Sequence, residues 1–316
     1  MNKKIIVGLD SSNYTSSCAF CDENGNIIEN IKLLLPVKSG ENGLRQSDAV
    51  FSHIKNYQNI ANYIKQKATQ YKIEAIGYSA RPRDVEGSYM PCFLVGETIA
   101  EMLSAFYNAR TFRYSHQAGH IRAAIYSSKA PLDDEDFLAF HVSGGTTEIV
   151  LVKNNGYTYD IEKIGGSCDL NAGQVIDRIG VLMGMSFPCG KEIEQYALQN
   201  TKKLPNNKIC VRKYSCNLSG LENLALKLYK DTNDKALTSA FILDFIGKTI
   251  ETLSVNLREE FPNMRIIYAG GVMSNTIIKE RILSTLQNVY FAEPNFSTDN
   301  AAGIALLTYK EYQERS

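Results

Sequence analysis

The chain has 316 residues, of which 44% are hydrophobic and 22% charged, as in ordinary globular proteins with room for two cores. Lys and Arg together number 34, as do Asp and Glu, so no overall field attracts nucleic acid or a membrane surface. No segment has the length of a membrane span or a signal peptide, and seven irregularly spaced cysteines argue against a disulfide framework. We therefore expect a cytoplasmic protein.

The chain begins with three predicted strands joined by polar turns. The strands cover residues 4–9, 15–21 and 26–31. Between them lie the turns Asp10–Tyr14 and Glu23-Asn24-Gly25. Cys18 and Cys21 have the spacing of a metal-binding pair, but in a strand residues three apart point to opposite faces. We interpret them as structural thiols.

The same pattern recurs around residues 137–161. Two apolar strands flank the turn Ser143–Thr147, and a third strand follows Asn154-Asn155-Gly156. The Gly-Gly pair permits a tight turn and close approach of another group, and its N–H groups beside Ser and Thr hydroxyls suit a phosphate. Taken alone, the segment also fits an ordinary glycine hairpin. The repetition predicts a duplicated domain. A duplication of this kind resembles the actin-like, sugar-kinase and Hsp70 (ASKHA) α/β fold, and the resemblance implies two lobes around a nucleotide cleft.

The remaining elements follow in order. Helices are predicted at 48–70, from 91 onward, at 116–126, 174–184, 191–200, 236–260 and 276–286, with strands at 73–79 and 265–269. A last helix opens near Asp299. We predict an N-terminal lobe of residues 1–130, completed by the C-terminal helix 299–316, and a second lobe of residues 131–298.

Two of the four histidines have helical spacing. In a helix over 116–126, His116 and His120 lie one turn apart on one face and could ligate one divalent metal with a third ligand. A capping or core pair is equally compatible with this spacing. Asp299 is either a helix N-cap or a hard oxygen ligand.

Two further segments have a functional and a plain interpretation. The strand ending at Gly270-Gly271, before a helix opened by Ser274-Asn275, fits a nucleotide loop or an ordinary strand-to-helix turn. A basic run without any acid fits tRNA phosphates or a solvated loop; it contains Lys202, Lys203, Lys208, Arg212 and Lys213.

Taken together, six segments resemble the tRNA threonylcarbamoyladenosine synthase family (TsaD, formerly Gcp). They are Val7-Gly8-Leu9-Asp10-Ser11-Ser12, His116-x-x-Gly119-His120, Val142-Ser143-Gly144-Gly145, Asp177 with Phe187-Pro188-Cys189-Gly190, Gly270-Gly271-Val272-Met273-Ser274-Asn275, and Ser297-Thr298-Asp299-Asn300-Ala301-Ala302. Their order and spacing span nearly the whole chain.

The resemblance implies site residues, a reaction and partners. His116, His120 and Asp299 match the family's iron or zinc ligands. Its nucleotide and substrate contacts match Val142, Ser143, Gly144, Gly145, Thr146, Asp177, Gly190, Asn275 and, one turn after Gly190, Glu194. The implied reaction transfers threonylcarbamoyl from threonylcarbamoyl-AMP to a tRNA adenosine. It uses one divalent metal, binds an adenine nucleotide (the adenylate, ATP or AMP), and involves TsaB-like and TsaE-like partner proteins but no membrane.

The chain departs from the family on the acceptor side. Asn13-Tyr14-Thr15-Ser16 replaces the usual Cys-Asp-Glu-Thr, which leaves Asp10 as the nearest candidate catalytic carboxylate. The usual Arg-Gly-Pro-Gly loop is Ala80–Gly87, the Glu of the histidine motif is Ala118, and Thr146 replaces the customary His or Asn. We interpret the chain as a divergent enzyme. The alternative is a non-catalytic or re-purposed nucleotide-binding paralogue that scaffolds or regulates the synthase or carbamoylates another acceptor.

Overall fold

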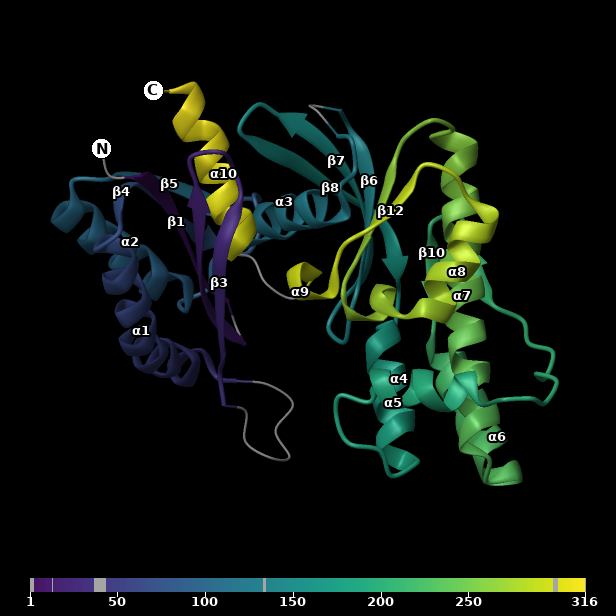
Figure 1. Cartoon of the computed structure of the whole chain (residues 1–316). Coiled ribbons are helices and arrows are strands. Elements are labelled where there is room, and N and C mark those ends of the chain that lie inside the picture. The colour runs from purple at the N-terminus through teal and green to yellow at the C-terminus, as the bar shows by residue number, and fades with distance from the viewer. Residues whose placement is uncertain (1–2, 13, 37–43, 133–134, 298–300, 316) are drawn as a thin grey trace. The chain divides into compact units, whose positions relative to one another are not determined.

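A computed structural model describes residues 3–12, 14–36, 44–132, 135–297 and 301–315 of the chain (Figure 1). Backbone contacts divide the chain into two units. Unit 1 comprises Met1–Tyr126, Asn154–Asp160 and Thr298–Ser316, and unit 2 comprises Ser127–Lys153 and Ile161–Ser297. The chain forms one five-stranded and one seven-stranded sheet.

The five-stranded sheet has the order β3-β2-β1-β4-β5. Its strands are β1 (Lys3–Ser11), β2 (Thr15–Asp22), β3 (Ile27–Leu34), β4 (Tyr71–Arg81) and β5 (Arg110–Ser115). β1, β2 and β3 form the predicted antiparallel meander, whereas β4 runs parallel to β1 and β5 parallel to β4. β1 is buried from Ile5 to Ser11 because helices cover both faces of the sheet.

The helices of this unit follow the apolar rhythm of the sequence. They are α1 (Gln46–Ala68), α2 (Phe93–Tyr107), α3 (His116–Ser128) and α10 (Ala301–Glu314). α1 and α2 lie on one side of the sheet and α10 on the other (Figure 1). In α1 the buried positions Ala49, His53, Tyr57, Ile60 and Ile64 recur every three or four residues, which is why this segment forms a surface helix.

The seven-stranded sheet has the order β12-β11-β6-β7-β8-β10-β9. Its strands are β6 (Phe137–Val142), β7 (Thr147–Asn155), β8 (Thr158–Ser167), β9 (Cys210–Arg212), β10 (Ser215–Asn217), β11 (Ile266–Ala269) and β12 (Val289–Phe291). β6, β7 and β8 are adjacent and in chain order, as β1, β2 and β3 are, which confirms the predicted duplication. β11 extends the sheet in parallel to β6.

Helices of unit 2 surround its core. They are α4 (Ala172–Leu182), α5 (Gly190–Leu198), α6 (Ser219–Thr232), α7 (Lys235–Glu260), α8 (Thr276–Thr285), α9 (Pro294–Ser297) and the short 3₁₀ helix η1 (Gly271–Ser274). α7 is the central helix and packs against α5, α6 and α8. Among the described residues, none of the helices has the length and hydrophobicity needed to cross a membrane.

Candidate functional site

The two histidines lie where the sequence predicted them. α3 begins at His116, and the rings of His116 and His120 stack edge to face with centroids 4.7 Å apart. The ring of Phe93, from α2, lies 5.6 Å from that of His116. The predicted helix is confirmed, and both imidazoles are on one face of it.

Asp10 lies beside this pair rather than at the surface. The residue is only 2% exposed. Its Oδ1 atom accepts a hydrogen bond from the hydroxyl of Ser79 and lies 3.0 Å from Nδ1 of His116. The sequence named Asp10 as the carboxylate nearest the acceptor, and the structure places it against the histidine motif.

These donors fit a divalent metal. Two imidazoles are the nitrogen ligands preferred by Zn²⁺ and Fe²⁺, and a carboxylate behind a ligating histidine is the usual outer partner. The third predicted ligand, Asp299, lies outside the described residues. Within the described part of the chain, no group of three or more His, Cys, Asp or Glu residues is arranged to hold a metal. The site therefore needs an oxygen ligand beyond the two histidines.

The turn between β6 and β7 closes on itself. The N–H of Ser143 donates to the carbonyl of Thr146 at 2.7 Å. The Ser143 hydroxyl accepts from the N–H groups of Gly145 and Thr146, at 3.3 and 3.1 Å. The sequence predicted N–H groups here that suit a phosphate, but those of Gly145 and Thr146 are already bonded within the turn. A phosphate would have to take them over from the serine hydroxyl.

The start of α4 abuts the same turn. The N–H of Gly173 donates to the carbonyl of Ser143 at 3.1 Å. A Cβ atom on Gly173 would lie 2.6 Å from the backbone nitrogen of Gly144, closer than real Cβ atoms approach, so only glycine fits. This arrangement points the positive end of a helix at the turn and favours an anion there.

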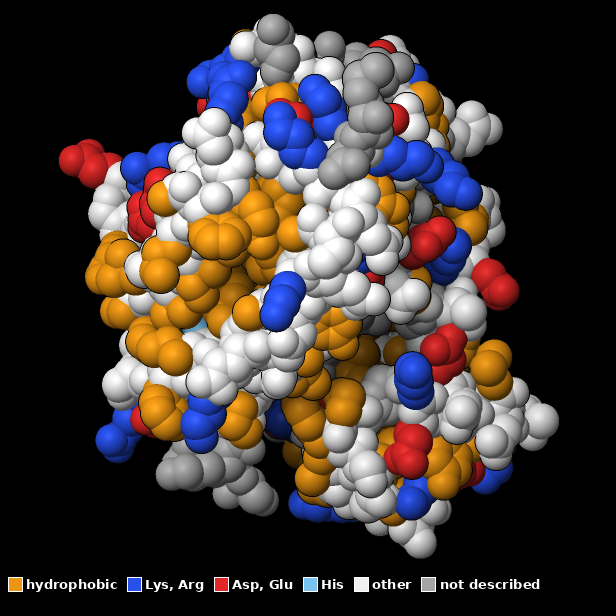
Figure 2. Space-filling view, turned by 60° about the vertical axis from the view of Figure 1, so that its left-hand side comes forward, with side chains coloured by type: hydrophobic (Ala, Val, Ile, Leu, Met, Phe, Trp, Pro, Cys, Tyr) orange, Lys and Arg blue, Asp and Glu red, His pale blue; other side chains and the backbone are white. Residues whose placement is uncertain are grey.

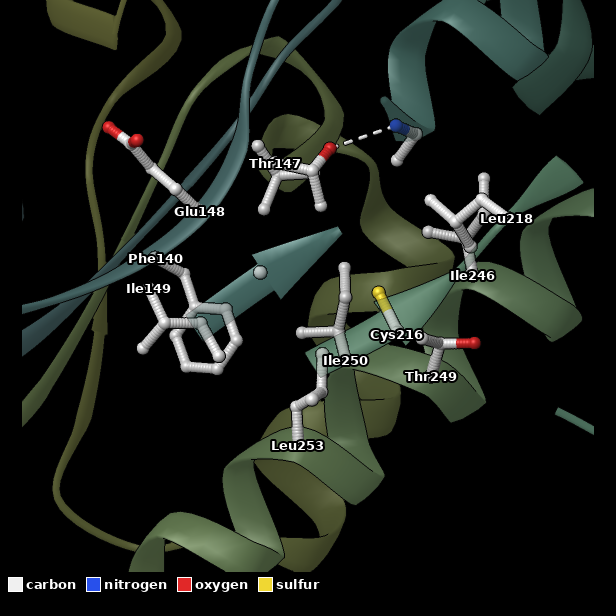
Figure 3. A pocket seen from close by; sticks show the side chains of 13 residues that line it. Phe140, Thr147, Glu148, Ile149, Cys216, Leu218, Ile246, Thr249, Ile250 and Leu253 are labelled. Carbon is white, nitrogen blue, oxygen red and sulfur yellow. Dashed lines mark hydrogen bonds between the residues drawn. The ribbon is translucent and has the colours of Figure 1, made fainter. Parts of the chain in front are cut away.

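An apolar cavity lies next to the turn inside unit 2 (Figure 3). Its lining includes Phe140, Ile149, Ile246, Ile250 and Leu253. At its rim the Thr147 hydroxyl accepts from the N–H of Ala172 at 2.9 Å, and the Glu148 carboxylate points away from the apolar side chains (Figure 3). The lining is too apolar to bind a nucleotide, so we assign the cavity to the core.

Asp177 joins the turn to the start of α5. Its Oδ1 accepts from the N–H of Cys189 at 2.8 Å, and its Oδ2 lies 3.9 Å from the position that a Cβ on Gly144 would occupy. Burial raises the pKa of the Asp177 carboxyl above its usual value, although the Cys189 hydrogen bond opposes this. Asp177 was identified by the family resemblance and not by a local sequence pattern.

Glu194 connects α5 to α8, and Asn275 caps α8. Glu194 Oε1 accepts from the N–H and the hydroxyl of Thr276, at 2.7 and 2.5 Å. The Asn275 side chain caps α8 by accepting from the N–H of Ile278 at 3.1 Å. Nearby, Gly270 has φ of 101° and would bring a Cβ to 2.2 Å from the Val142 carbonyl. The loop after β11 is thus packed directly on the end of β6.

The predicted nucleotide residues are consequently linked by contacts within unit 2. Val142 meets Gly270, Gly144 lies near Asp177, Asp177 holds the residue before Gly190, and Glu194 holds the residue after Asn275. Sequence reasoning missed Gly173 and Thr147, which hold α4 against the turn. The only available signal was the Asn171-Ala172-Gly173 start of a helix.

The basic run is less isolated in the structure than in the sequence. Lys202 pairs with Asp234 at 2.7 Å, and Lys213 pairs with Glu260 at 3.0 Å. Lys203, Lys208 and Arg212 are exposed. Both lysines are largely exposed, so the two pairs are weak, and the remaining positive charge of the run lies on Lys203, Lys208 and Arg212.

Comparison with known proteins is consistent with this geometry. Two similar meanders in two α/β units define the duplicated actin-like, sugar-kinase and Hsp70 class of nucleotide-binding folds. A model of the family "tRNA N6-adenosine threonylcarbamoyltransferase" (TsaD) matches residues 42–306. The chain belongs to the TsaD family.

Solved structures of other proteins share the fold. HypF from T. kodakarensis has a TM-score of 0.62 at 10% identity, covering 99% of this chain and 48% of that one. A full-length HypF in a phosphate- and nucleotide-bound form has a TM-score of 0.60 at 13% identity, covering 99% and 46%. Component A of (R)-2-hydroxyglutaryl-CoA dehydratase from Acidaminococcus fermentans has a TM-score of 0.56 at 12% identity, covering 98% and 99%. The chain spans about half the length of the HypF chains, and these identities establish the fold alone.

Proposed function

We propose that the protein transfers a threonylcarbamoyl group from threonylcarbamoyl-AMP to the exocyclic amine of a tRNA adenosine. The observation that carries the proposal is the convergence in unit 2 of four separate segments that match the family's nucleotide contacts. They are the turn Ser143–Thr146, Asp177, Glu194 and Asn275. Membership of the TsaD family supports the reaction class.

In this proposal the chain's own residues hold the adenylate. The N–H groups of Gly145 and Thr146 bind the phosphate in place of the Ser143 hydroxyl, and the positive end of the α4 helix dipole favours its negative charge. Gly190, Glu194 and Asn275 lie toward the nucleoside. ATP or AMP would bind in the same place.

The metal, Fe²⁺ or Zn²⁺, would be held by His116, His120 and Asp299. When bound, it would supply a Lewis acid that polarises a substrate oxygen and stabilises the leaving phosphate. In the transfer the amine nitrogen bonds to the carbamoyl carbon, the bond from that carbon to the phosphate oxygen breaks, and AMP leaves with the electron pair. The amine loses one proton.

One observation favours a second function. Tyr14 and Thr15 stand where relatives carry an acidic pair, and Asp10 is buried against Ser79 and His116. This segment therefore has no solvent-exposed carboxylate that could accept the proton from the attacking amine. The alternative is a nucleotide-binding paralogue that scaffolds or regulates the synthase, or carbamoylates another acceptor.

Partner proteins have a suitable surface on unit 1. α1 and α2 expose large hydrophobic side chains, among them Phe51, Met102 and Phe106, which are 60%, 68% and 78% exposed. Figure 2, in which this side comes forward, shows hydrophobic side chains gathered over a broad area. Patches of this kind mark interaction sites. α2 carries Glu97 and Glu101 and no basic residue, so a TsaB-like or TsaE-like partner should present an apolar face with a basic rim.

The deciding assay supplies threonylcarbamoyl-AMP, Zn²⁺ or Fe²⁺, partner proteins and unmodified tRNA, and detects modified adenosine by mass spectrometry. The enzyme hypothesis is supported if wild type forms product, His116→Ala does not, and Val255→Ala does. Val255 is an exposed residue of α7 and serves as the control. No product from a protein that still binds ATP and its partners would favour the scaffold. Binding of the partner proteins should be lost in Phe106→Asp and kept in Val255→Asp.

Contact with tRNA is tested through salt dependence. Replacing Lys203, Lys208 and Arg212 by alanine should make tRNA affinity depend less steeply on salt concentration. The slope should decrease by the equivalent of about three phosphate contacts. The matched control replaces the exposed Lys227 and Lys230 of α6. If both sets of replacements change the salt dependence equally, tRNA does not bind specifically at the basic run.

A further inference from the structure

A buried carboxylate, hydroxyl and imidazole meet at the start of α3. Asp10 is 2% exposed and Ser79 1% exposed, and they lie on the parallel neighbours β1 and β4 one position beyond the pair Leu9 and Tyr78. The same oxygen of Asp10 accepts from the Ser79 hydroxyl and contacts His116 Nδ1 at 3.0 Å. The sheet therefore fixes the carboxylate, and the carboxylate fixes one edge of the imidazole.

We propose that Asp10, oriented by Ser79, is a positioning residue that keeps the proton of His116 on Nδ1 and so directs Nε2 to a divalent metal. The proposal rests on the metal site of the proposed function and assigns Asp10 a role different from proton removal at the acceptor.

The chemistry follows from burial. A carboxylate removed from water must receive hydrogen bonds, and the Ser79 hydroxyl and the His116 N–H are the donors that reach its Oδ1. In a neutral imidazole only one nitrogen carries the proton, so a donor Nδ1 makes Nε2 the ligating atom. A carboxylate that accepts from the outer nitrogen also strengthens a histidine as a metal ligand.

The neighbouring rings support the same orientation. Phe93 packs on His116 with centroids 5.6 Å apart, and His120 lies edge to face with it at 4.7 Å. Rotation of the His116 ring would break the Asp10 contact and disturb both ring contacts. The imidazole is thus held in one orientation before any metal arrives, which reduces the entropy lost on binding.

The first measurement concerns the protein without metal. Long-range ¹H–¹⁵N NMR at pH 8 should show the wild-type His116 ring protonated on Nδ1 and mixed between its two nitrogens in Asp10→Ala. Wild-type protonation on Nε2 would overturn the proposal. A purely structural carboxylate would leave the tautomer unchanged in the variant, which would overturn it as well.

The second measurement is Zn²⁺ affinity by competition with a chelator. Asp10→Ala should bind Zn²⁺ roughly 10- to 100-fold more weakly, and Asp10→Asn less so because its amide oxygen still accepts from Nδ1. The Zn²⁺ affinity of Ser79→Ala should lie between those of wild type and Asp10→Ala. The matched control is Glu311→Gln, a buried carboxylate of α10 that binds Tyr114 and Arg315.

The outcomes distinguish a failure of the positioning role of Asp10 from a failure of the proposed metal site. Wild-type Zn²⁺ affinity in folded Asp10→Ala, or an equal loss in Glu311→Gln, contradicts positioning. If Asp10→Ala does not fold, Asp10→Asn and Ser79→Ala decide in the same way. If wild type binds no Zn²⁺ but its tautomer depends on Asp10, positioning stands and the proposed metal function fails.

Discussion

Replacing Gly173 by alanine tests whether α4 and the phosphate turn act as one rigid piece. The new Cβ would lie 2.6 Å from Gly144 N, 2.7 Å from the Ser143 carbonyl carbon and 2.8 Å from Gly144 Cα. All three are backbone atoms, so no flexible side chain can rotate away. Relief requires the turn or the helix to shift by several tenths of an ångström.

The magnitude follows from comparable overpacking. Forcing a methyl group against a packed backbone costs about 1–3 kcal/mol of unfolding free energy. The same shift displaces the N–H groups of the turn, so ATP or AMP affinity should fall about tenfold or more, which is about 1.4 kcal/mol. Stability and binding should decrease together.

Gly145 supplies the contrast. A Cβ there meets nothing within 4 Å, so Gly145→Val should change stability by less than about 0.5 kcal/mol. If the phosphate lies against this turn, the bulkier side chain should still weaken nucleotide binding about tenfold. The two glycines thus separate damage to the fold from damage to the site.

Stability is measured by urea denaturation followed by circular dichroism, because the chain has no Trp, and affinity by calorimetry. Wild-type stability of Gly173→Ala would refute the rigid contact between α4 and the turn. Unchanged nucleotide affinity in Gly145→Val would place the nucleotide away from Ser143–Thr146.

Three further predictions follow from individual contacts. Thr147→Val removes the acceptor for the N–H of Ala172 and should lower unfolding free energy by about 1 kcal/mol, whereas Thr147→Ser should retain it; thermal denaturation decides. At Asp169 burial opposes ionisation, but hydrogen bonds from the Ser219 side chain and the N–H groups of Leu218, Leu170 and Ser219 outweigh it and hold the pKa well below its usual value. A depressed pKa stabilises the fold above the unfolded value of about 3.9, and this contribution is lost as pH falls through the folded pKa. Because Asp169 is exposed, solvent screens these interactions, and Asp169→Asn should cost at most about 1 kcal/mol at pH 7; urea titrations should show the difference narrowing below pH 4. Asn275→Asp keeps an N-cap on α8 and should retain the melting temperature, but its charge should weaken ATP binding in calorimetry; equal affinity would exclude Asn275 from the nucleotide site.

The sequence was informative where the determining pattern was local. Apolar runs bounded by polar turns predicted the two meanders, and a helical apolar rhythm predicted α1, because each signal rests on residues within a few positions of one another. The i,i+4 spacing likewise predicted the stacked rings of His116 and His120. The family motifs then grouped the residues of unit 2.

Contacts between distant segments could not be read in this way. His116 meets Asp10 from 106 positions away, and Asp177 reaches the N–H of Cys189 only because α4 and α5 fold back on each other. β9, β10 and β12 have three residues each, too few for a periodic signal. The basic run seemed free of acids because Asp234 and Glu260 belong to other segments.

The distribution of roles among these residues bears on whether the protein is an enzyme. Gly173, Gly270 and Glu194 hold neighbouring segments of unit 2 together and Asn275 caps α8, so their presence is explained by folding as well as by nucleotide binding. The contacts of Asp10 with Ser79 and His116 also join β1, β4 and α3, but apolar side chains could join these elements as well. Buried polar groups of this kind are commonly replaced by apolar ones at no cost to stability, or with a gain. A scaffold that only bound nucleotide could dispense with the cluster, whereas a metal-dependent transferase requires an oriented imidazole, and this asymmetry favours the enzyme.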